Sequence, residues 1–175
     1  PKAGFVIYGG KDTTNPPTDH VPARDILVQN SIVLDLNDGQ WGSNGYLYGG
    51  FSTAGYLHDV IYNGSIALNL TAVNNSMKAI VGFYQYSLNG TPYSQGGQFN
   101  NSVAWDVDGI GIYWGQALNT GHSYVDNVTI GEKALNGVYA RPSGNINTVN
   151  RTRLHVTDSI FRNVTKLSVA NQSYS

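Results

Sequence analysis

Short runs of alternating apolar and polar residues recur along the whole chain, separated by asparagine, glycine and proline. No window carries apolar residues at the 3.6-residue spacing of an amphipathic helix, and none has the residues that cap one. Tyrosine, threonine, valine and isoleucine suit a pleated sheet, whereas asparagine and glycine suit the turns between strands. The pattern therefore predicts an all-β chain. Strands are expected over residues 3–8, 26–36, 45–51, 56–62, 65–73, 78–88, 103–114, 122–130, 137–141, 153–161 and 164–170.

The turns between these runs decide the expected architecture. Asn63-Gly64 lies between two alternating runs, which is the usual signal of a two-residue β-hairpin, and Asn89-Gly90 repeats it more weakly. Many short strands joined in this way favour an antiparallel β-sandwich of jelly-roll or immunoglobulin-like type. A parallel β-helix is the alternative, because asparagine, glycine and threonine also suit the turns of a solenoid. The chain shows no repeat of fixed period, which favours the sandwich.

The N-terminal region suggests a division of the 175 residues into three parts. Residues 1–10 hold a short β segment that ends at Gly9-Gly10. Residues 11–22 are polar and contain three prolines, as an extended linker does. Residues 23–175 are expected to form one β domain, which is an ordinary size for a single hydrophobic core.

Charge and cysteine content exclude several partners. The net charge is −1 without any basic run, so neither nucleic acid nor an anionic membrane surface is an expected partner. No apolar stretch reaches the 18 residues of a membrane-spanning helix. With no cysteine, disulfides, zinc–thiolate sites and thiol catalysis are excluded. We expect a protein on the outside of the cell, its signal peptide already removed.

Glycosylation signals are the main argument for that location. The 19 asparagines and 26 serines and threonines would give about three Asn-x-Ser/Thr sequons by chance, and the chain has nine. In the run from residue 66 to 72, strand alternation places Asn69 and Thr71 opposite Ile66, Leu68 and Leu70. We therefore expect covalent N-linked glycans on the solvent side of the strands. The expected sites are Asn63, Asn69, Asn74, Asn89, Asn100, Asn127, Asn150, Asn163 and Asn171.

The remaining motifs favour structural roles over chemistry. Asp106-Val-Asp108-Gly109 begins like a calcium loop, but the later glutamate is missing, so a turn with outward carboxylates is the preferred interpretation. The four histidines, which are far apart, have no metal-ligand spacing, and there is no nucleophile elbow. We expect no enzyme, no cofactor and no metal site. The histidines are His20, His58, His122 and His155.

Aromatic residues offer one possible binding surface. A sugar-stacking platform could be built from six of them, although core and interface packing is the preferred interpretation because two of the tryptophans lie inside apolar runs. The six are Trp41, Tyr46, Tyr48, Trp105, Tyr113 and Trp114.

The layout of a β segment, a proline-rich linker and a sequon-rich β domain resembles the subunits of archaeal glycosylated threads and bundling pili. Those proteins are similar in fold to bacterial type I pilins and are joined head to tail by donor strands. The resemblance covers the full length in layout and composition and has no defining short motif. Type I pilins normally hold a disulfide, which this chain lacks.

What the resemblance implies is a structural subunit of an extracellular filament that serves adhesion or biofilm formation. Its partners are other copies of itself, and the donor strand is the segment with Ala3, Phe5, Val6, Ile7 and Tyr8. A short segment before Gly-Gly cannot bury Phe5 and Ile7 locally, which favours insertion into a neighbour. Two alternatives stay open: a secreted carbohydrate-binding or glycoside-active β protein, and a viral spike or capsid protein.

Overall fold

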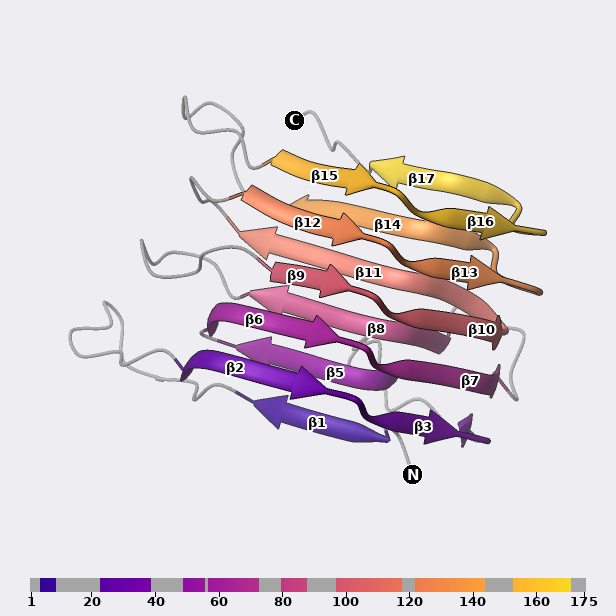
Figure 1. Cartoon of the computed structure of the whole chain (residues 1–175), viewed down its shortest axis with the longest axis horizontal. Coiled ribbons are helices and arrows are strands. Elements are labelled where there is room, and N and C mark those ends of the chain that lie inside the picture. Colours follow the sequence, from indigo (N-terminus) through magenta and orange to yellow (C-terminus); the bar gives the residue numbers. More distant parts are fainter. Residues whose placement is uncertain are drawn as a thin grey trace.

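The protein is a parallel β-solenoid in the computed structural model, which describes residues 4–8, 23–38, 49–55, 57–72, 80–87, 97–117, 122–143 and 153–170. Three parallel sheets, here named A, B and C, run the length of the described part. The chain winds through them in turn, so that coil lies on coil from the indigo N-terminal end to the yellow C-terminal end (Figure 1). None of the described elements is a helix long and apolar enough to cross a membrane.

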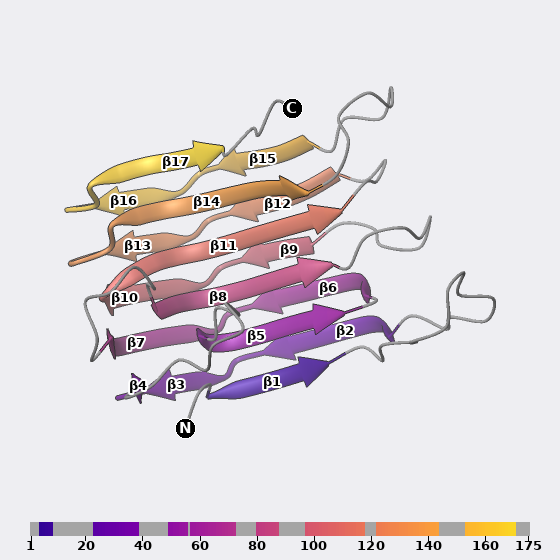
Figure 2. The same cartoon turned by 180° about the vertical axis from the view of Figure 1, so that it is seen from behind.

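Each coil contributes one strand to each sheet. Sheet A contains β1 (Phe5–Tyr8), β5 (Gly49–Gly55), β8 (Ile80–Ser87), β11 (Gly109–Ala117), β14 (Asn136–Ser143) and β17 (Lys166–Ala170). Sheet B contains β2 (Ala23–Gln29), β6 (Leu57–Asn63), β9 (Gly97–Asn100), β12 (His122–Asp126) and β15 (Arg153–Thr157). Sheet C contains β3 (Ile32–Leu34), β7 (Ile66–Ala72), β10 (Val103–Val107), β13 (Thr129–Gly131) and β16 (Ile160–Arg162), and β4 (Asn37–Asp38) also pairs with β7. Figure 2 shows sheet A in front, running against the strands of sheets B and C behind it.

This architecture corrects the expected antiparallel sandwich and agrees with the parallel β-helix alternative. Asn63-Gly64 does not close a hairpin: it joins β6 to β7, which belong to different sheets. The expected runs 26–36 and 103–114 each split into two strands. The period is hidden because equivalent residues of sheet A, from Phe51 to Phe83, Ile112 and Val138, follow one another after 32, 29 and 26 residues.

The N-terminal segment is also corrected. β1 pairs in parallel with β5 of its own chain, in the register Phe5 to Phe51, and therefore forms the first strand of sheet A. The Phe5 and Phe51 rings lie 6.0 Å apart. An N-terminal donor strand that completes a neighbour's sheet is thus wrong as a description of this fold. The proposed linker, residues 11–22, lies outside the described residues.

The core fills the interior of the coils with stacked rows of side chains. Phe51 and Phe83 stack face to face at 5.1 Å, and Tyr62 and Phe99 stack beside them at 5.4 Å. Burial raises the pKa of Tyr62, whose hydroxyl donates a hydrogen bond to Thr53 Oγ1 at 3.0 Å. Stacking identical or similar side chains on successive coils lets each coil bury the apolar face of the next.

Sheets B and C meet at a corner made mostly of asparagine, which we call the amide corner. One residue per coil takes the left-handed conformation there, with φ between 46° and 61°. Asparagine, aspartate and glycine adopt this conformation most readily. The backbone N–H of each of the first four residues donates to a carbonyl of the following coil. The five residues are Asn30, Gly64, Asn101, Asn127 and Asp158.

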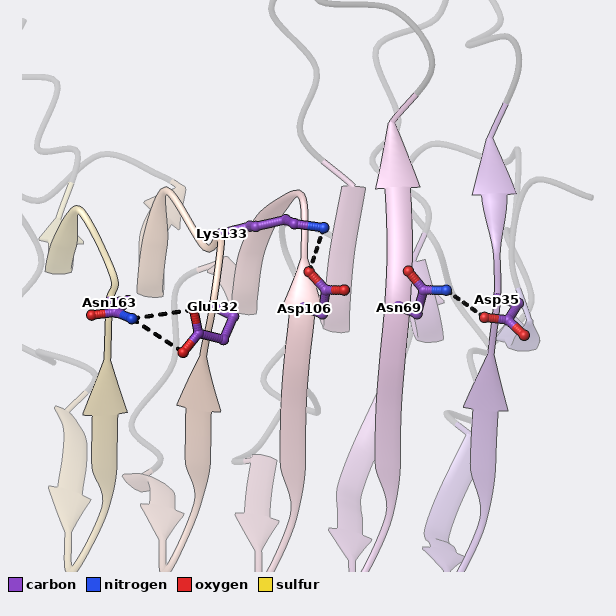
Figure 3. A network of polar contacts seen from close by, with 6 residues as sticks. All are labelled: Asp35, Asn69, Asp106, Glu132, Lys133 and Asn163. Carbon is purple, nitrogen blue, oxygen red and sulfur yellow. Dashed lines mark hydrogen bonds and ion pairs between the residues drawn. The ribbon is translucent and has the colours of Figure 1, made fainter.

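Sheets C and A meet at a second corner, which we call the charged corner. Its residues also have positive φ, but they are mainly ionisable. Asn69 donates to Asp35 at 2.5 Å, Lys133 pairs with Asp106 at 2.6 Å, and Asn163 donates to both carboxylate oxygens of Glu132 at 3.1 Å (Figure 3). The row comprises Asp35, Asn69, Asp106, Glu132, Lys133 and Asn163.

Candidate functional site

The outer face of sheet B carries two rows of side chains in register, which we call the polar face. Along each strand of sheet B, buried core residues such as Tyr62, Phe99 and Val125 alternate with residues that point away from the core. One row contains Leu27, Ile61, Gln98, Tyr124 and His155. The other contains Gln29, Asn63, Asn100, Asp126 and Thr157.

Neighbouring side chains on the polar face hold one another in place. Asn100 Nδ2 donates to Gln98 Oε1 at 3.2 Å, and Thr157 Oγ1 donates to Asp126 Oδ1 at 2.6 Å. The rings of Tyr124 and His155 are stacked, with centroids 5.1 Å apart and planes at 17°. Tyr124 nevertheless remains 42% exposed. These contacts fix the side chains in advance of any ligand.

The polar face offers hydrogen-bonding side chains next to the aromatic ring of Tyr124. Amide groups offer both donors and acceptors, and a carboxylate and a hydroxyl extend the set. Strand spacing repeats these groups about every 4.8 Å along the solenoid. Such a surface suits a neutral, extended ligand that has many hydroxyl groups and an apolar side for an aromatic ring.

The six aromatic residues predicted as a platform are not brought together. Trp114 lies in the core, and Trp105 lies on the outer face of sheet C with Arg162 5.9 Å from its ring centre. Tyr113 is buried on the outer face of sheet A, where its ring stacks on Tyr139 and lies tilted against Tyr84. The other three, Trp41, Tyr46 and Tyr48, lie outside the described residues.

Five of the nine predicted glycosylation sites lie in the described part. Asn69, Asn127 and Asn163 are exposed residues of the two corners, whereas Asn63 and Asn100 are half-buried on the polar face. The facing expected for residues 66–72 is only partly right. Asn69 and Thr71 are exposed and Leu70 is buried, as expected, but Asn69 has positive φ and bends the chain, so Ala67 is buried whereas Ile66 and Leu68 are only half-buried. The sites Asn74, Asn89, Asn150 and Asn171 fall outside the described residues.

The corner geometry gives a second physical reason for the recurrence of Asn-x-Ser/Thr. Asn127 donates to Asn101 at 2.8 Å, so its amide already links two coils. Ser65 and Ser102, the hydroxyl residues of the Asn63 and Asn100 sequons, are fully buried beneath the amide corner. An exposed or half-buried asparagine followed two residues later by a buried serine is required by the packing of the coils. This packing gives Asn-x-Ser sequences even if no glycan is attached. Glycan attachment therefore stays a prediction.

The candidate motifs of metal binding do not come together. Asp106 and Asp108 lie beside the charged corner, where Asp106 pairs with Lys133. Among the residues that the structure describes, no group of three histidines and carboxylates could hold a metal ion. His155 stacks on Tyr124, His58 and His122 lie on sheet B strands, and His20 is outside the described residues.

Sequence reasoning missed the polar face. β9 was not predicted as a strand, although Gln98 and Asn100 flank the apolar Phe99 in the same way that Tyr124 and Asp126 flank Val125. That shared alternation was the available signal.

No protein-family model, no curated protein and no solved structure matches the chain significantly. The resemblance to thread and pilus subunits therefore gains no support from relatives.

Proposed function

We propose that this chain is an extracellular carbohydrate-binding module that presents the polar face to a polysaccharide. The observation that carries the proposal is the stack of the exposed Tyr124 on the half-buried His155, in register with rows of amide, carboxylate and hydroxyl side chains. The low content of charged residues, 12%, fits a neutral ligand better than a phosphorylated or sulfated one. A rigid solenoid also matches the repeat of an extended polymer with its own strand spacing.

Tyr124 is expected to supply the apolar contact and Asp126 an acceptor for sugar hydroxyl groups. Thr157 orients the Asp126 carboxylate through its hydrogen bond, so Thr157 acts as a positioning residue. The half-buried Asn63 and Asn100 lie on the same face, and glycans on them would cover it. We therefore place any N-linked glycans of the described part on Asn69, Asn127 and Asn163, at the corners.

The test is calorimetry and affinity electrophoresis of the chain against a panel of soluble plant, algal and microbial polysaccharides. Tyr124→Ala should weaken binding of a positive polysaccharide by roughly tenfold, the effect of losing one aromatic contact. Asp126→Asn, which keeps the shape but alters the acceptor, should weaken it less. Leu135→Ala removes a similarly exposed apolar side chain away from the polar face and should leave binding unchanged.

Two results would contradict the proposal. One is the absence of binding to every polysaccharide in the panel by a protein whose circular dichroism shows folded β structure. The other is binding that Tyr124→Ala and Asp126→Asn leave intact. Glycopeptide mapping of the natively produced protein by mass spectrometry checks the glycan assignment: occupancy of Asn63 or Asn100 would contradict the placement of glycans at the corners.

A further inference from the structure

Both ends of the described solenoid leave a complete coil without a neighbour. Among the described residues, no strand pairs with the outer edges of β1, β2 and β3 at one end, or of β17, β15 and β16 at the other. Core-facing side chains are uncovered there: Phe5 is 38% exposed at the first end and Val156 is 44% exposed at the second. Unpaired strand edges beside exposed apolar side chains favour association with another chain.

The hydrogen-bonding groups at the two ends are complementary. Inside the solenoid, the N–H of each left-handed residue of the amide corner donates to the carbonyl before the equivalent residue of the following coil, as Asn30 donates to Asn63 O at 3.0 Å. By the same rule, the Asp158 N–H of the last coil would donate to Gln29 O of the first coil of a second copy stacked on it. Gln29 O already accepts the Ser31 hydroxyl at 2.9 Å, as Thr157 O accepts Ser159 at 2.7 Å.

A second set of bonds runs in the opposite direction. The N–H of the first sheet C residue in each coil donates to a carbonyl of the preceding coil, as Ile160 donates to Val128 O at 2.8 Å. The Ile32 N–H occupies this position in the first coil and points out of the end of the solenoid. Its equivalent acceptor on a last coil is Ser159 O. Ile32 itself is 65% exposed.

The described residues of the two ends carry opposite net charges. The described first coil carries one arginine and three aspartates, whereas the last carries three basic residues and one aspartate. At the charged corner, Asp35 lies on the first coil, and the exposed Arg162 and Lys166 lie on the last. Arg162 already reaches across one coil, with its Nε 3.4 Å from Glu132 Oε1. A first coil stacked on the last would bring Asp35 within similar reach.

We propose that copies of this chain stack head to tail, the first coil of one on the last coil of the next, and so continue all three sheets across the junction. The contact joins two different surfaces, and contacts of that kind propagate as an open chain. Stacking differs from donor-strand exchange because β1 stays in its own sheet. It also leaves the polar face open along the side of the assembly, so the inference does not depend on carbohydrate binding.

The test measures the mass of the full 175-residue chain by light scattering over a range of concentrations and ionic strengths, with negative-stain microscopy of the same samples. We expect mass to grow with concentration and to fall with added salt, which screens the charged ends. Ile32→Pro removes the outward N–H at the first residue of an edge strand, a position that tolerates proline. It should abolish growth while leaving the circular dichroism of the folded monomer unchanged.

A charge exchange provides the specific control. Asp35→Arg and Arg162→Asp should each raise the concentration needed for assembly by roughly tenfold, the effect of replacing an attractive charge pair by a repulsive one. The double variant Asp35→Arg/Arg162→Asp should restore assembly, because both ends are reversed together. Asp108→Lys, an equal change of charge at an exposed residue away from the ends, should have no effect.

The proposal is overturned by a chain that stays monomeric at every concentration and ionic strength. It is overturned equally by assembly that survives Ile32→Pro, or by a double variant that folds but does not recover. Restored assembly in the double variant together with growth lost in Ile32→Pro supports stacking of coil ends over lateral association of the sheet faces.

Discussion

The amide corner and the charged corner solve the same backbone problem with different side chains. Both turn the chain with a residue of positive φ in every coil. At the amide corner, buried serines lie behind neutral asparagines, and Ser102 Oγ accepts the Ser65 N–H at 3.3 Å. At the charged corner the partners lie nearer the solvent: in the Lys133–Asp106 pair, the Lys133 side chain is 60% exposed and the Asp106 side chain 29%. A buried neutral ladder should therefore hold the coils together more strongly than an exposed ionic one.

The difference follows from what each corner encloses. Ser65 and Ser102 are covered on both sides by neighbouring coils, so a lost hydrogen bond there leaves a polar group with no access to water. Asp35, Asn69 and Asn163 are exposed, so water replaces any partner that they lose. Neighbouring coils are therefore fixed mainly from inside the amide corner.

The largest effect is expected for Ser102→Ala. Ser102 is fully buried, accepts the Ser65 N–H and donates to Asn100 O at 2.7 Å. Removing its hydroxyl leaves the Ser65 N–H buried without that acceptor, which costs about 1–3 kcal/mol of unfolding free energy. Thermal denaturation should show a fall in Tm of roughly 2–4 °C per kcal/mol for a chain of this size. Ser31→Ala, in the half-buried first coil, is the matched control, and an equal loss in both variants would contradict the argument.

A smaller loss is expected for Gly64→Ala. Gly64 has φ of 61°, and a Cβ there would lie 2.5 Å from Asn30 Oδ1. The left-handed conformation costs alanine about 1–2 kcal/mol, whereas the end of the Asn30 side chain can move aside. Denaturant unfolding of Gly64→Ala and of Asn30→Ala/Gly64→Ala separates the two causes. Full recovery in the double variant would mean that the contact with Asn30 dominates over backbone conformation.

The corners also explain how much of the fold was predictable. The all-β class follows directly from alternation, as in 57–63 and 66–72, where the expected and observed strands nearly coincide. The turn at Asn63-Gly64 was located correctly, but its type was wrong. A hairpin turn and a solenoid corner both need a residue of positive φ, so Asn-Gly signals either one. The local sequence does not determine whether the next strand pairs with the first strand or belongs to another sheet.

The polar face was missed for a related reason. Gln98 and Tyr124 become neighbours only through the parallel pairing of β9 and β12. Their separation of 26 residues differs from that of Ile61 and Gln98, which is 37, because the connections between strands vary in length. No fixed period marks the coils. A sequence criterion that aligned the asparagines of the amide corner, and not the whole coil, would have found the register.

The smallest effect is expected at the charged corner, for Lys133→Ala. The hydrogen bond and charge of Asp106 raise the pKa of Lys133 above its ordinary value of 10.5. A raised pKa means that the pair stabilises the folded state fully below the unfolded pKa, and that this contribution disappears as pH rises through the folded value. Because Lys133 is exposed, the Tm difference between wild type and Lys133→Ala should be smaller than either loss at the amide corner. It should also shrink with added salt, and above pH 10.5 as the lysine deprotonates. A Tm difference as large as that of Ser102→Ala would show that the two corners hold the coils with equal strength. A difference that salt does not reduce would show that the charge pair is not its cause.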